Sequence, residues 1–564
     1  MRRDCKPAKG LSKSYCQGAC AIPLSAQTIG DVLFSKEIDP DMTLFTSPEY
    51  NQRMTIKELQ GKAVLFSKWL LQNDVKKGDV VMVTGVANLY YLPVLLGAVS
   101  VGCICQTVTT SHFRQNLTQQ INPSVIVVGH QIEKEAYAYA EKLKNNQVSD
   151  RPSSNLKLID IWGNNNEGQE YLSDDSSITD DQYDSAVRLV SPEDPAIILR
   201  TTGSTGSSKA VLLSHKTLVN LGTFCVDRSM ACDEEHQKDI VAVPNPVTDD
   251  VQAPLITVQI LVNWKSKCCV FCPTWLDYGC EDIERFAIFL QDEKITSYRG
   301  YTYEIVKLVN SEFINLYDIS KLTLVNMVAQ AVSKSMREKI FQYFPKSMVI
   351  YGASECLVGT ATSSSLSSQE QLMNSIGYPF PHTEIKIVGN GGELLPIRTP
   401  GEICIKGFGV FSGYLYNESE TCPVDNNGWL HTGDIGEMDD TGHIVFIGRK
   451  GDHMTFKHGG DKIYPKHITD VASSHPNIFE SAVVGLQSDE NGDDIFLFCV
   501  LKDESKDSPN SLKDFMVQNA PHEIVIPDYI VPVKCLPRIG ARNKVDSRAL
   551  VAIATEVRQA AQAS

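Results

Sequence analysis

The stretch Thr201-Thr202-Gly203-Ser204-Thr205-Gly206-Ser207-Ser208-Lys209 decides the fold of this chain. It is a run of hydroxyls and glycines that ends in a lysine, and apolar runs at residues 196–199 and 211–213 flank it. Each apolar run predicts a buried strand, and a helix is expected from Ser214. Glycines let backbone N–H groups approach a ligand closely, hydroxyls donate to phosphate oxygens, and the lysine adds positive charge. The stretch therefore predicts a polyphosphate-binding loop between two strands.

Two other interpretations of this loop compete with that prediction. The Walker A loop of P-loop NTPases needs glycine where Ser208 stands and serine or threonine where Ala210 stands, so the sequence does not match it. A solvent-exposed Ser/Gly linker stays open as an alternative, although linkers seldom lie between two apolar strands.

Length and charge limit the class of protein. A chain of 564 residues is too long for one core, so two or more domains are expected. Apolar residues make up 42% and charged residues 21%, which is typical of soluble globular proteins. The net charge of −16 argues against a nucleic-acid partner and gives no support to an anionic membrane surface. A bound polyphosphate would have to be held by local donors against this acidic background.

The cysteines and the N-terminus bear on the compartment. Sixteen cysteines are scattered along the chain, and the only CxxC pattern is Cys269-Val270-Phe271-Cys272, with no second pair at zinc spacing. Buried free thiols are the favoured interpretation, and they predict an intracellular protein. Several arginines and lysines near the N-terminus are a weak feature of transit peptides, but an amphipathic apolar face is lacking.

A long uncharged segment raises the question of a transmembrane helix. Residues 80–113 contain no Asp, Glu, Lys or Arg. Gly85, Asn88, Pro93 and Gly97 interrupt this run, so a strand, a helix and a strand in a buried sheet fit it better. No integral membrane span is expected, and membrane association stays open as an alternative.

Strand and helix patterns alternate along the first part of the chain. Thr55 and Glu58 have the spacing of a capping box, and apolar residues follow at helical spacing as far as Leu70. The polar and acidic residues 144–186 are expected to form a surface excursion. The alternation predicts an α/β fold with doubly wound, mostly parallel sheets. The remaining elements expected here are a strand at 80–83, a helix at 92–99, and strands near 104 and at 125–128.

The loop at residues 201–209 resembles the phosphate-binding signature of the adenylate-forming enzymes, which include acyl-CoA synthetases, firefly luciferase and the adenylation domains of peptide synthetases. The resemblance spans roughly residues 14–555. Details at residues 14–18, 244–246 and 381–384 look similar to medium-chain acyl-CoA synthetases of the mitochondrial type. The other motifs that resemble this family are Tyr351-Gly352-Ala353-Ser354-Glu355, Gly428-Trp429-Leu430-His431-Thr432-Gly433-Asp434, residues 442–452, and Leu536-Pro537-Arg538-Ile539-Gly540-Ala541-Arg542-Asn543-Lys544.

This resemblance implies a domain arrangement. Residues 1–449 would form a large N-terminal adenylation domain, built from doubly wound sheets and a β-rich subdomain. Residues 450–564 would form a small, mobile α+β C-terminal domain on a hinge at Gly451 or Asp452. The segments 375–379, 401–407 and 413–414 would be scaffold of the β-rich subdomain.

The resemblance also implies how the nucleotide is held. Tyr351 would pack on the adenine, Asp434 would accept both ribose hydroxyls, and Arg449 would reach the nucleotide. The residues implied to bind the phosphates of ATP are Thr201, Thr202, Gly203, Ser204, Thr205, Gly206 and Lys209.

Three residues would act at the reacting atoms. The hydroxyl of Ser354 would touch the α-phosphate, and Glu355 would hold Mg²⁺. Lys544 would reach over the substrate carboxylate and the α-phosphate. The reaction implied is the ATP-dependent activation of a fatty acid to an acyl-adenylate, and then to an acyl-CoA with coenzyme A as co-substrate, in the mitochondrion or the cytoplasm.

Three departures from the family pattern leave another function open. Asp249 stands where a histidine is usual, Val328-Ala329-Gln330 stands where the family has Gly-Gly-Ala beside the adenine, and Asn543 replaces a glycine. Because these changes fall on pocket and loop positions, the alternative is a catalytically weakened paralogue that binds a nucleotide or acyl ligand as a sensor or partner. Adenylation with another acceptor, as in luciferase, is a further alternative.

Overall fold

The computed structural model describes residues 6–563 apart from a set of short segments, and every structural statement below concerns the described part. The segments outside the description are 49–50, 85–88, 109–120, 130–132, 146–155, 161–175, 202–208, 231–239, 244–256, 260, 263–268, 272–281, 301, 329–331, 364, 416–421, 452, 456–461, 489–491, 504, 521–525 and 540–543.

A seven-stranded sheet carries the two strands that were predicted around the loop. Its order is β19-β9-β8-β5-β4-β6-β7, and the pairs from β8 through β5, β4 and β6 to β7 are parallel. β8 and β9 are antiparallel neighbours, so the chain turns back on itself across residues 201–209. The strands are β4 (Val80–Thr84), β5 (Ile104–Val108), β6 (Val125–Val128), β7 (Lys157–Asp160), β8 (Pro195–Arg200), β9 (Ala210–Ser214) and β19 (Gly413–Tyr414).

Helices cover this sheet as the sequence predicts. In α2 (Ile56–Gln72) the Thr55 hydroxyl accepts the backbone N–H of Glu58, and the Glu58 carboxylate accepts the N–H of Thr55, which confirms the capping box. α3 (Tyr91–Ser100) follows β4 and precedes β5 in the chain, and all of its residues are buried. The strand–helix–strand prediction is therefore confirmed. No helix in the described part of the chain is long and apolar enough to cross a membrane.

The expectation of a purely surface excursion at residues 144–186 is wrong. β7 pairs in parallel with β6 and completes the edge of the sheet, and Thr179 caps α6 (Asp180–Arg188). An edge strand needs only one bonded neighbour and half-buried side chains, so four residues in a polar setting suffice without a long apolar run. The other helices of this region are α1 (Ile29–Leu33) and α5 (Glu133–Lys144).

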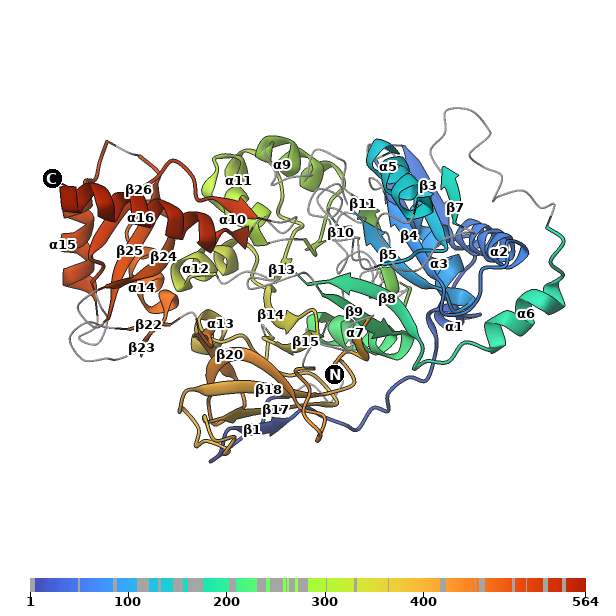
Figure 1. Ribbon diagram of the computed structural model, residues 1–564, viewed down its shortest axis with the longest axis horizontal. Helices are drawn as coiled ribbons and strands as arrows, with labels where there is room; N and C mark the ends of the chain where they lie inside the picture. Colours follow the sequence, from blue (N-terminus) through green and yellow to red (C-terminus); the bar gives the residue numbers. More distant parts are fainter. Residues whose placement is uncertain are drawn as a thin grey trace.

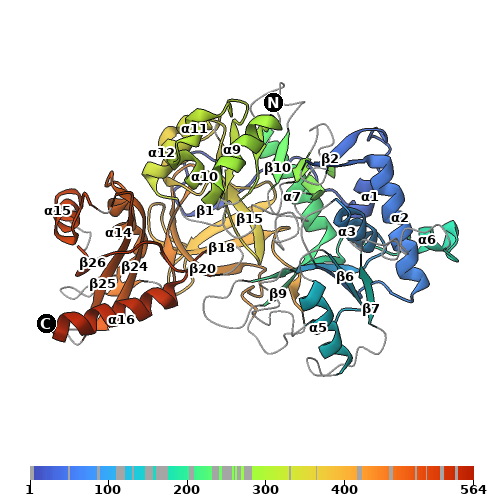
Figure 2. The same ribbon diagram turned by 90° about the horizontal axis from the view of Figure 1, so that it is seen from above.

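A nine-stranded sheet lies next to the first, and Figures 1 and 2 show the two sheets and their helices filling the N-terminal part of the molecule. Its order is β16-β15-β14-β13-β12-β10-β11-β2-β3, parallel from β2 to β14 and antiparallel at both edges. Two mostly parallel sheets confirm the α/β prediction. The strands are β2 (Thr43–Ser47), β3 (Gln52–Thr55), β10 (Val241–Val243), β11 (Cys269–Phe271), β12 (Ser297–Tyr298), β13 (Leu324–Met327), β14 (Met348–Ala353), β15 (Cys356–Ala361) and β16 (Tyr378–Pro379).

The helices that belong to this second region follow from the same alternation. Asp282 and Ser333 accept backbone N–H groups at the starts of α9 and α12 through their side chains. The helices are α7 (His215–Met230), α9 (Ile283–Asp292), α10 (Thr302–Asn310), α11 (Phe313–Leu316), α12 (Lys334–Tyr343) and α13 (Gln369–Asn374). The helix expected from Ser214 is α7. The ten cysteines whose side chains the structure describes are free thiols.

An antiparallel five-stranded sheet forms the β-rich subdomain. Its order is β1-β17-β18-β20-β21, with strands at Tyr15–Gln17, Thr383–Val388, Gly401–Gly407, Leu430–Met438 and Ile444–Arg449. β1 pairs with β17, and the Tyr15 hydroxyl donates to Glu384 at 2.7 Å. The segments 14–18 and 381–384, both singled out in the sequence, are therefore neighbours. A Cβ on Gly18 would lie 1.8 Å from the Phe380 carbonyl oxygen, so only glycine fits there.

Two segments expected in this subdomain belong to other sheets. β16, which holds Tyr378 and Pro379, extends the nine-stranded sheet. β19, which holds Gly413 and Tyr414, pairs with β9 of the seven-stranded sheet. Their assignment to the β-rich subdomain was wrong, because strands this short carry no periodicity that would predict their partners.

The C-terminal part has cores of its own. Three apolar clusters contain only residues up to Phe446, and two contain only residues from Met454 onward. The larger elements are β24 (Ile478–Ser488), β25 (Gly492–Leu501), β26 (Tyr529–Pro532), α14 (Pro465–Ala472), α15 (Pro509–Asn519) and α16 (Ser547–Ala563). Two short hairpins join them, β22 (Met454–Thr455) with β23 (Lys462–Ile463) and β27 (Arg538–Ile539) with β28 (Lys544–Val545). Separate cores support a domain boundary near the proposed position 449/450.

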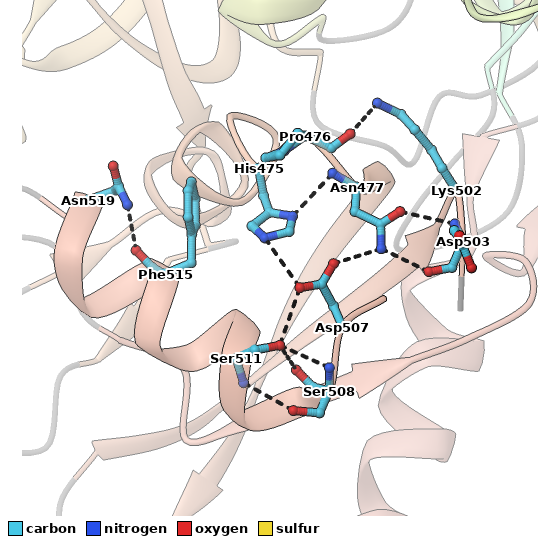
Figure 3. Close-up of polar contacts among 10 residues, drawn as sticks. All are labelled: His475, Pro476, Asn477, Lys502, Asp503, Asp507, Ser508, Ser511, Phe515 and Asn519. Atoms are coloured by element: carbon cyan, nitrogen blue, oxygen red, sulfur yellow. Dashed lines mark hydrogen bonds and ion pairs between the residues drawn. The ribbon is translucent and has the colours of Figure 1, made fainter. Parts of the chain in front are cut away.

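A polar network ties this part together, as Figure 3 shows. The His475 ring accepts the N–H of Asn477 on Nδ1 at 3.2 Å, its Nε2 lies 3.7 Å from Asp507, and its ring packs edge-on against Phe515. The Asn477 amide donates to the Asp503 carbonyl at 2.8 Å and to Asp507 at 2.7 Å. The network joins the start of β24, the segment after β25 and the cap of α15, so it acts as scaffold.

Candidate functional site

The ends of the predicted phosphate loop are closed by hydrogen bonds. The Thr201 N–H donates to the Lys209 carbonyl at 2.9 Å, and the Lys209 N–H donates to the Thr201 hydroxyl at 2.9 Å. Arg200 on β8 pairs with Ala210 on β9, so both ends are fixed by the sheet. Thr202, Gly203, Ser204, Thr205 and Gly206 lie outside the described residues.

The Tyr351–Glu355 motif forms the turn between β14 and β15. A Cβ on Gly352 would lie 2.0 Å from the Leu357 carbonyl oxygen, so the close approach of the two strands requires glycine. Ser354 and Glu355 are half-buried at the turn. The Glu355 carbonyl accepts the N–H of Phe411 at 2.9 Å, which fixes the turn against the segment that leads into β19.

Tyr414 links this turn to the phosphate loop, a role that the sequence analysis missed. Its hydroxyl donates to Glu355 Oε1 at 2.9 Å. Lys209 Nζ lies 4.9 Å from the centre of the same ring. The link exists because β19 pairs with β9, with Tyr414 opposite Val211. Glu355 and Lys209, predicted to serve the metal and the phosphates, are therefore joined through one tyrosine.

Asp434 gathers two more of the predicted residues. It is only 4% exposed, and it lies on β20 directly opposite Arg449 on β21. The Tyr351 hydroxyl donates to Asp434 Oδ2 at 2.6 Å, and Arg449 Nε donates to Oδ1 at 3.0 Å. Burial, and then the charge of Asp434, raise the pKa of Tyr351 well above its usual range, so the phenol stays protonated as a donor.

The contacts above form two clusters. One cluster is Tyr351, Asp434 and Arg449, and the other is Lys209, Tyr414 and Glu355. Tyr351 and Glu355 belong to the same turn, so the clusters are adjacent along β14 and β15.

The residues that lead into the C-terminal part are bonded to the Asp434 segment. The Lys450 N–H donates to the Gly433 carbonyl at 2.7 Å, and Lys450 Nζ lies 3.3 Å from Glu402. Glu402 also accepts the N–H of Gly433 at 3.2 Å, a second contact that the sequence did not indicate. Gly451 has φ +103°, a conformation that favours glycine, and Asp452 lies outside the described residues.

Lys544 is described only through its backbone. It opens β28 and pairs with Ile539 on β27. Its side chain and Asn543 lie outside the described residues, so its predicted contact with the substrate carboxylate stays a prediction.

The comparison with known families decides what these clusters belong to. The family described as AMP-binding enzyme matches residues 35–415 of this chain. The chain belongs to the AMP-binding enzyme family. The match ends at β19 and includes the phosphate loop and the Tyr351–Glu355 turn.

Curated relatives and solved structures cover nearly the whole chain. The human protein named medium-chain acyl-CoA ligase ACSF2, mitochondrial, is 26% identical over 94% of this chain and 88% of its own length. A long-chain-fatty-acid–CoA ligase of Escherichia coli is 27% identical over 80% of this chain and 82% of its own length. ATP-bound MatB from Rhodopseudomonas palustris superposes with a TM-score of 0.76 at 19% identity, covering 93% of this chain and 98% of MatB. The anthranilate CoA ligase AuaEII, in complex with anthranoyl-AMP, gives 0.77 at 17% identity, covering 94% and 98%. These structural likenesses confirm the fold.

The carboxylate chemistry of this AMP-binding enzyme fits Mg²⁺ bound together with a nucleotide. In the described part of the chain no group of three or more His, Cys, Asp or Glu residues could hold a metal ion by itself. Mg²⁺ prefers oxygen ligands and is commonly held by one or two carboxylates with substrate phosphates and water. Glu355, beside the phosphate loop, can supply one such carboxylate.

The departures from the family pattern are only partly described. Val328 follows β13, and the Thr302 hydroxyl bonds both its N–H and its carbonyl, at 3.0 Å each. This pair of bonds fixes the start of the predicted adenine wall to the first turn of α10. Ala329, Gln330 and Asp249 lie outside the described residues.

Proposed function

We propose that this chain is an AMP-forming acyl-CoA ligase that activates a fatty acid, of medium chain length, with ATP and coenzyme A. The relatives named acyl-CoA ligase support the reaction, and the human medium-chain relative supports the substrate class. The observation that carries the proposal is the meeting of Asp434, Arg449 and Tyr351 with Glu355 and Lys209 beside the phosphate loop.

The first step joins two anions. A carboxylate oxygen of the fatty acid attacks the α-phosphorus of ATP, and a new O–P bond forms. The bond from the α-phosphorus to the oxygen that bridges it to the β-phosphate breaks, and pyrophosphate leaves. Lys209 and Lys544 lower the repulsion between the anions, and catalysis is mainly positioning and electrostatic stabilisation. Glu355 would hold Mg²⁺ bound with ATP, and that ion would supply positive charge near the leaving pyrophosphate. Tyr414 holds Glu355, and Ser354 donates to the α-phosphate.

The nucleotide is held by the buried aspartate. Asp434 accepts the two ribose hydroxyls, and its low exposure makes each such bond strong because water competes little. Arg449 donates to Asp434 and reaches the phosphate end of the nucleotide. Tyr351 presents its ring to the adenine, with its orientation set by the bond from its hydroxyl to Asp434.

The second step needs another arrangement of the C-terminal part. The sulfur of coenzyme A attacks the acyl carbon, the C–S bond forms, the bond from that carbon to the phosphate oxygen breaks, and AMP leaves as the thiol loses its proton. We infer that residues 450–564 turn as a unit on Gly451 and Asp452 relative to residues 1–449, which removes Lys544 and admits the thiol. Separate cores on the two sides of this point support a rigid-body motion.

The test is carboxylate-dependent ATP–pyrophosphate exchange by the purified chain over short, medium and long fatty acids. Exchange that is strongest with medium-chain acids, followed by acyl-CoA formation when coenzyme A is added, is the expected result. Exchange with another chain length would correct the substrate class alone. Absence of exchange while ATP still raises the melting temperature would favour the weakened paralogue instead. The polar residues of both clusters are in place, which favours the active ligase over that alternative.

The compartment is proposed from the relatives. The mammalian relatives carry a mitochondrial designation, which favours the mitochondrion over the cytoplasm for this chain. Fractionation of cells that express the full chain with a C-terminal tag tests the assignment.

A further inference from the structure

Arg538, in the C-terminal part, contacts a residue of the N-terminal part. Its guanidinium Nη2 bonds both carboxylate oxygens of Glu480. Its Cζ also lies 5.0 Å from the centre of the Tyr303 ring. The Arg538 and Glu480 side chains are 18% and 21% exposed, so both contacts are largely shielded from water.

The two partners of Arg538 belong to different parts of the molecule. Glu480 lies on β24, in the same C-terminal part as Arg538. Tyr303 lies in the first turn of α10, in the N-terminal part, and Figure 1 shows the C-terminal part beside α10 and α12. A turn of residues 450–564 on Gly451 would therefore carry Arg538 and Glu480 together and, of these two contacts, would break the one with Tyr303.

Both ends of this contact adjoin residues of the proposed site. Arg538 opens β27, the strand that pairs with Lys544 and Val545. Tyr303 follows Thr302, whose hydroxyl holds Val328 at the start of the adenine wall. The Arg538–Tyr303 contact thus docks the hairpin that bears Lys544 against the edge of the nucleotide site.

Other described contacts also join the two parts, and α14 packs against β21. Ser335 on α12 donates to the Ser473 carbonyl at 3.0 Å. Burial lowers the pKa of Arg337 on α12 to about 10, and the charge of Asp470 on α14 opposes this shift. A cation–aromatic contact that is partly shielded from water contributes enough free energy to shift how often the docked arrangement is occupied.

We propose that Arg538 is a positioning residue that holds the β27–β28 hairpin in the adenylation arrangement through Tyr303, and that this contact is released for thioester formation. Glu480 keeps the guanidinium aimed at the ring in both arrangements. The inference rests on the proposed function, because it assigns the contact to one of the two half-reactions.

The test measures the two half-reactions separately. One assay is ATP–pyrophosphate exchange with a medium-chain fatty acid. The other is acyl-CoA formation from a synthetic medium-chain acyl-adenylate and coenzyme A. Tyr303→Leu removes the ring while leaving the Arg538–Glu480 pair intact. We expect exchange to fall about 10- to 30-fold and thioester formation to stay near the wild-type rate.

Three further variants make this result specific. Tyr303→Phe keeps the ring and should retain exchange. Arg538→Gln should reproduce the selective loss, but it also leaves Glu480 without its partner, so Tyr303→Leu is the decisive variant. Lys307→Gln is the matched control, because Lys307 Nζ lies 4.7 Å from the centre of the same ring but belongs to α10 itself. It should leave both half-reactions unchanged.

A readout without activity separates this inference from the proposed function. Lys450, at the connection between the parts, has a 60% exposed side chain, and trypsin cleavage there reports how firmly the parts are docked. Tyr303→Leu should be cleaved faster than wild type and Lys307→Gln. Equal loss of both half-reactions, or unchanged exchange with unchanged cleavage, would overturn the role of Arg538. A wild-type chain inactive in both half-reactions would overturn the proposed function, and cleavage alone would then decide whether the contact docks the parts.

Discussion

The cluster of Tyr351, Asp434 and Arg449 differs from the connection to the C-terminal part in how its side chains are held. Asp434 is held by two neighbours that lie on strands bonded into sheets, and all three side chains come from the N-terminal part. Lys544 lies in a two-residue strand of the other part, which reaches the site through the contact of Arg538 with Tyr303. The difference suggests a division of labour in which one half binds and stays fixed, while the other delivers one lysine and then withdraws it.

Lys544→Ala should have the largest effect, and it tests the role of the C-terminal part. Loss of a positioned cation at the reacting phosphate is expected to lower ATP–pyrophosphate exchange about 100- to 1,000-fold. Thioester formation from a supplied acyl-adenylate should continue, because the proposed mechanism uses Lys544 only in the first step. The exposed Lys534, in the same part of the chain, gives the control Lys534→Ala. Exchange that survives in Lys544→Ala would contradict the assignment.

Asp434→Asn should have the next largest effect, and it tests the role of the N-terminal part. The amide keeps the shape of the side chain but loses the charge that orients Arg449 and accepts the ribose hydroxyls. Hydrogen bonds to a charged group contribute about 1.5–3 kcal/mol each, so KM for ATP should rise about 10- to 100-fold. Steady-state kinetics with varied ATP measure it. Asp440→Asn is the control, since the Asp440 side chain pairs with Arg398 at 3.8 Å on the surface. An unchanged KM in Asp434→Asn would remove Asp434 from the nucleotide site.

Lowering the pH should lower the stability of the N-terminal part through a buried histidine, His215. Burial lowers the pKa of His215 to about 4, against the opposing effects of Asp194 and Asp31. The unfolded chain, in which histidine has its ordinary pKa near 6.5, binds more protons between about pH 6.5 and 4, so stability falls as the pH falls through that window. At pH 5 the loss from this one group is about 2 kcal/mol.

Urea unfolding at pH 7 and pH 5 measures this loss. His215→Asn keeps an acceptor for the Ile29 N–H, which His215 Nδ1 accepts at 3.2 Å in the wild type. The difference in unfolding free energy between the two pH values should be about 2 kcal/mol smaller in His215→Asn than in the wild type. Equal differences would show that His215 does not set the acid sensitivity.

Gly451→Ala should have the smallest effect and tests the connection itself. No atom lies within 4 Å of a Cβ at this position, so the substitution acts only through φ +103°. The strain is about 1 kcal/mol or more and disfavours the present arrangement, so exchange should fall about fivefold. Gly61→Ala is the matched control, because it also meets open space but lies within α2, where alanine favours the helix. A Gly451→Ala chain with wild-type exchange would locate the hinge elsewhere.

Much of the architecture followed from local pattern. The spacing of Thr55 and Glu58 predicted a capping box because both partners lie within one helical turn. The apolar runs beside residues 201–209 predicted β8 and β9 because both are buried on the sheet. Motif resemblance also named Asp434, Arg449 and Tyr351, three residues that the fold brings into direct contact.

What failed was everything that depends on partners far away in the sequence. The two-residue strand β19 carries no periodicity, so its pairing with β9, and with it the role of Tyr414, could not be predicted. β7 was missed because an edge strand in a polar segment lacks the apolar run that marks a central one.

The sequence by itself determined the family and the α/β class, and it named the charged residues proposed to bind the nucleotide, because local motifs and periodicity lie in neighbouring positions. Only the tertiary structure decided which of these residues touch. Glu355 and Lys209 meet through Tyr414, and Arg538 meets Tyr303 across two separate cores. Such contacts depend on how sheets align and how two bodies dock, and that geometry is fixed by the packing of the whole chain rather than by any one segment of it.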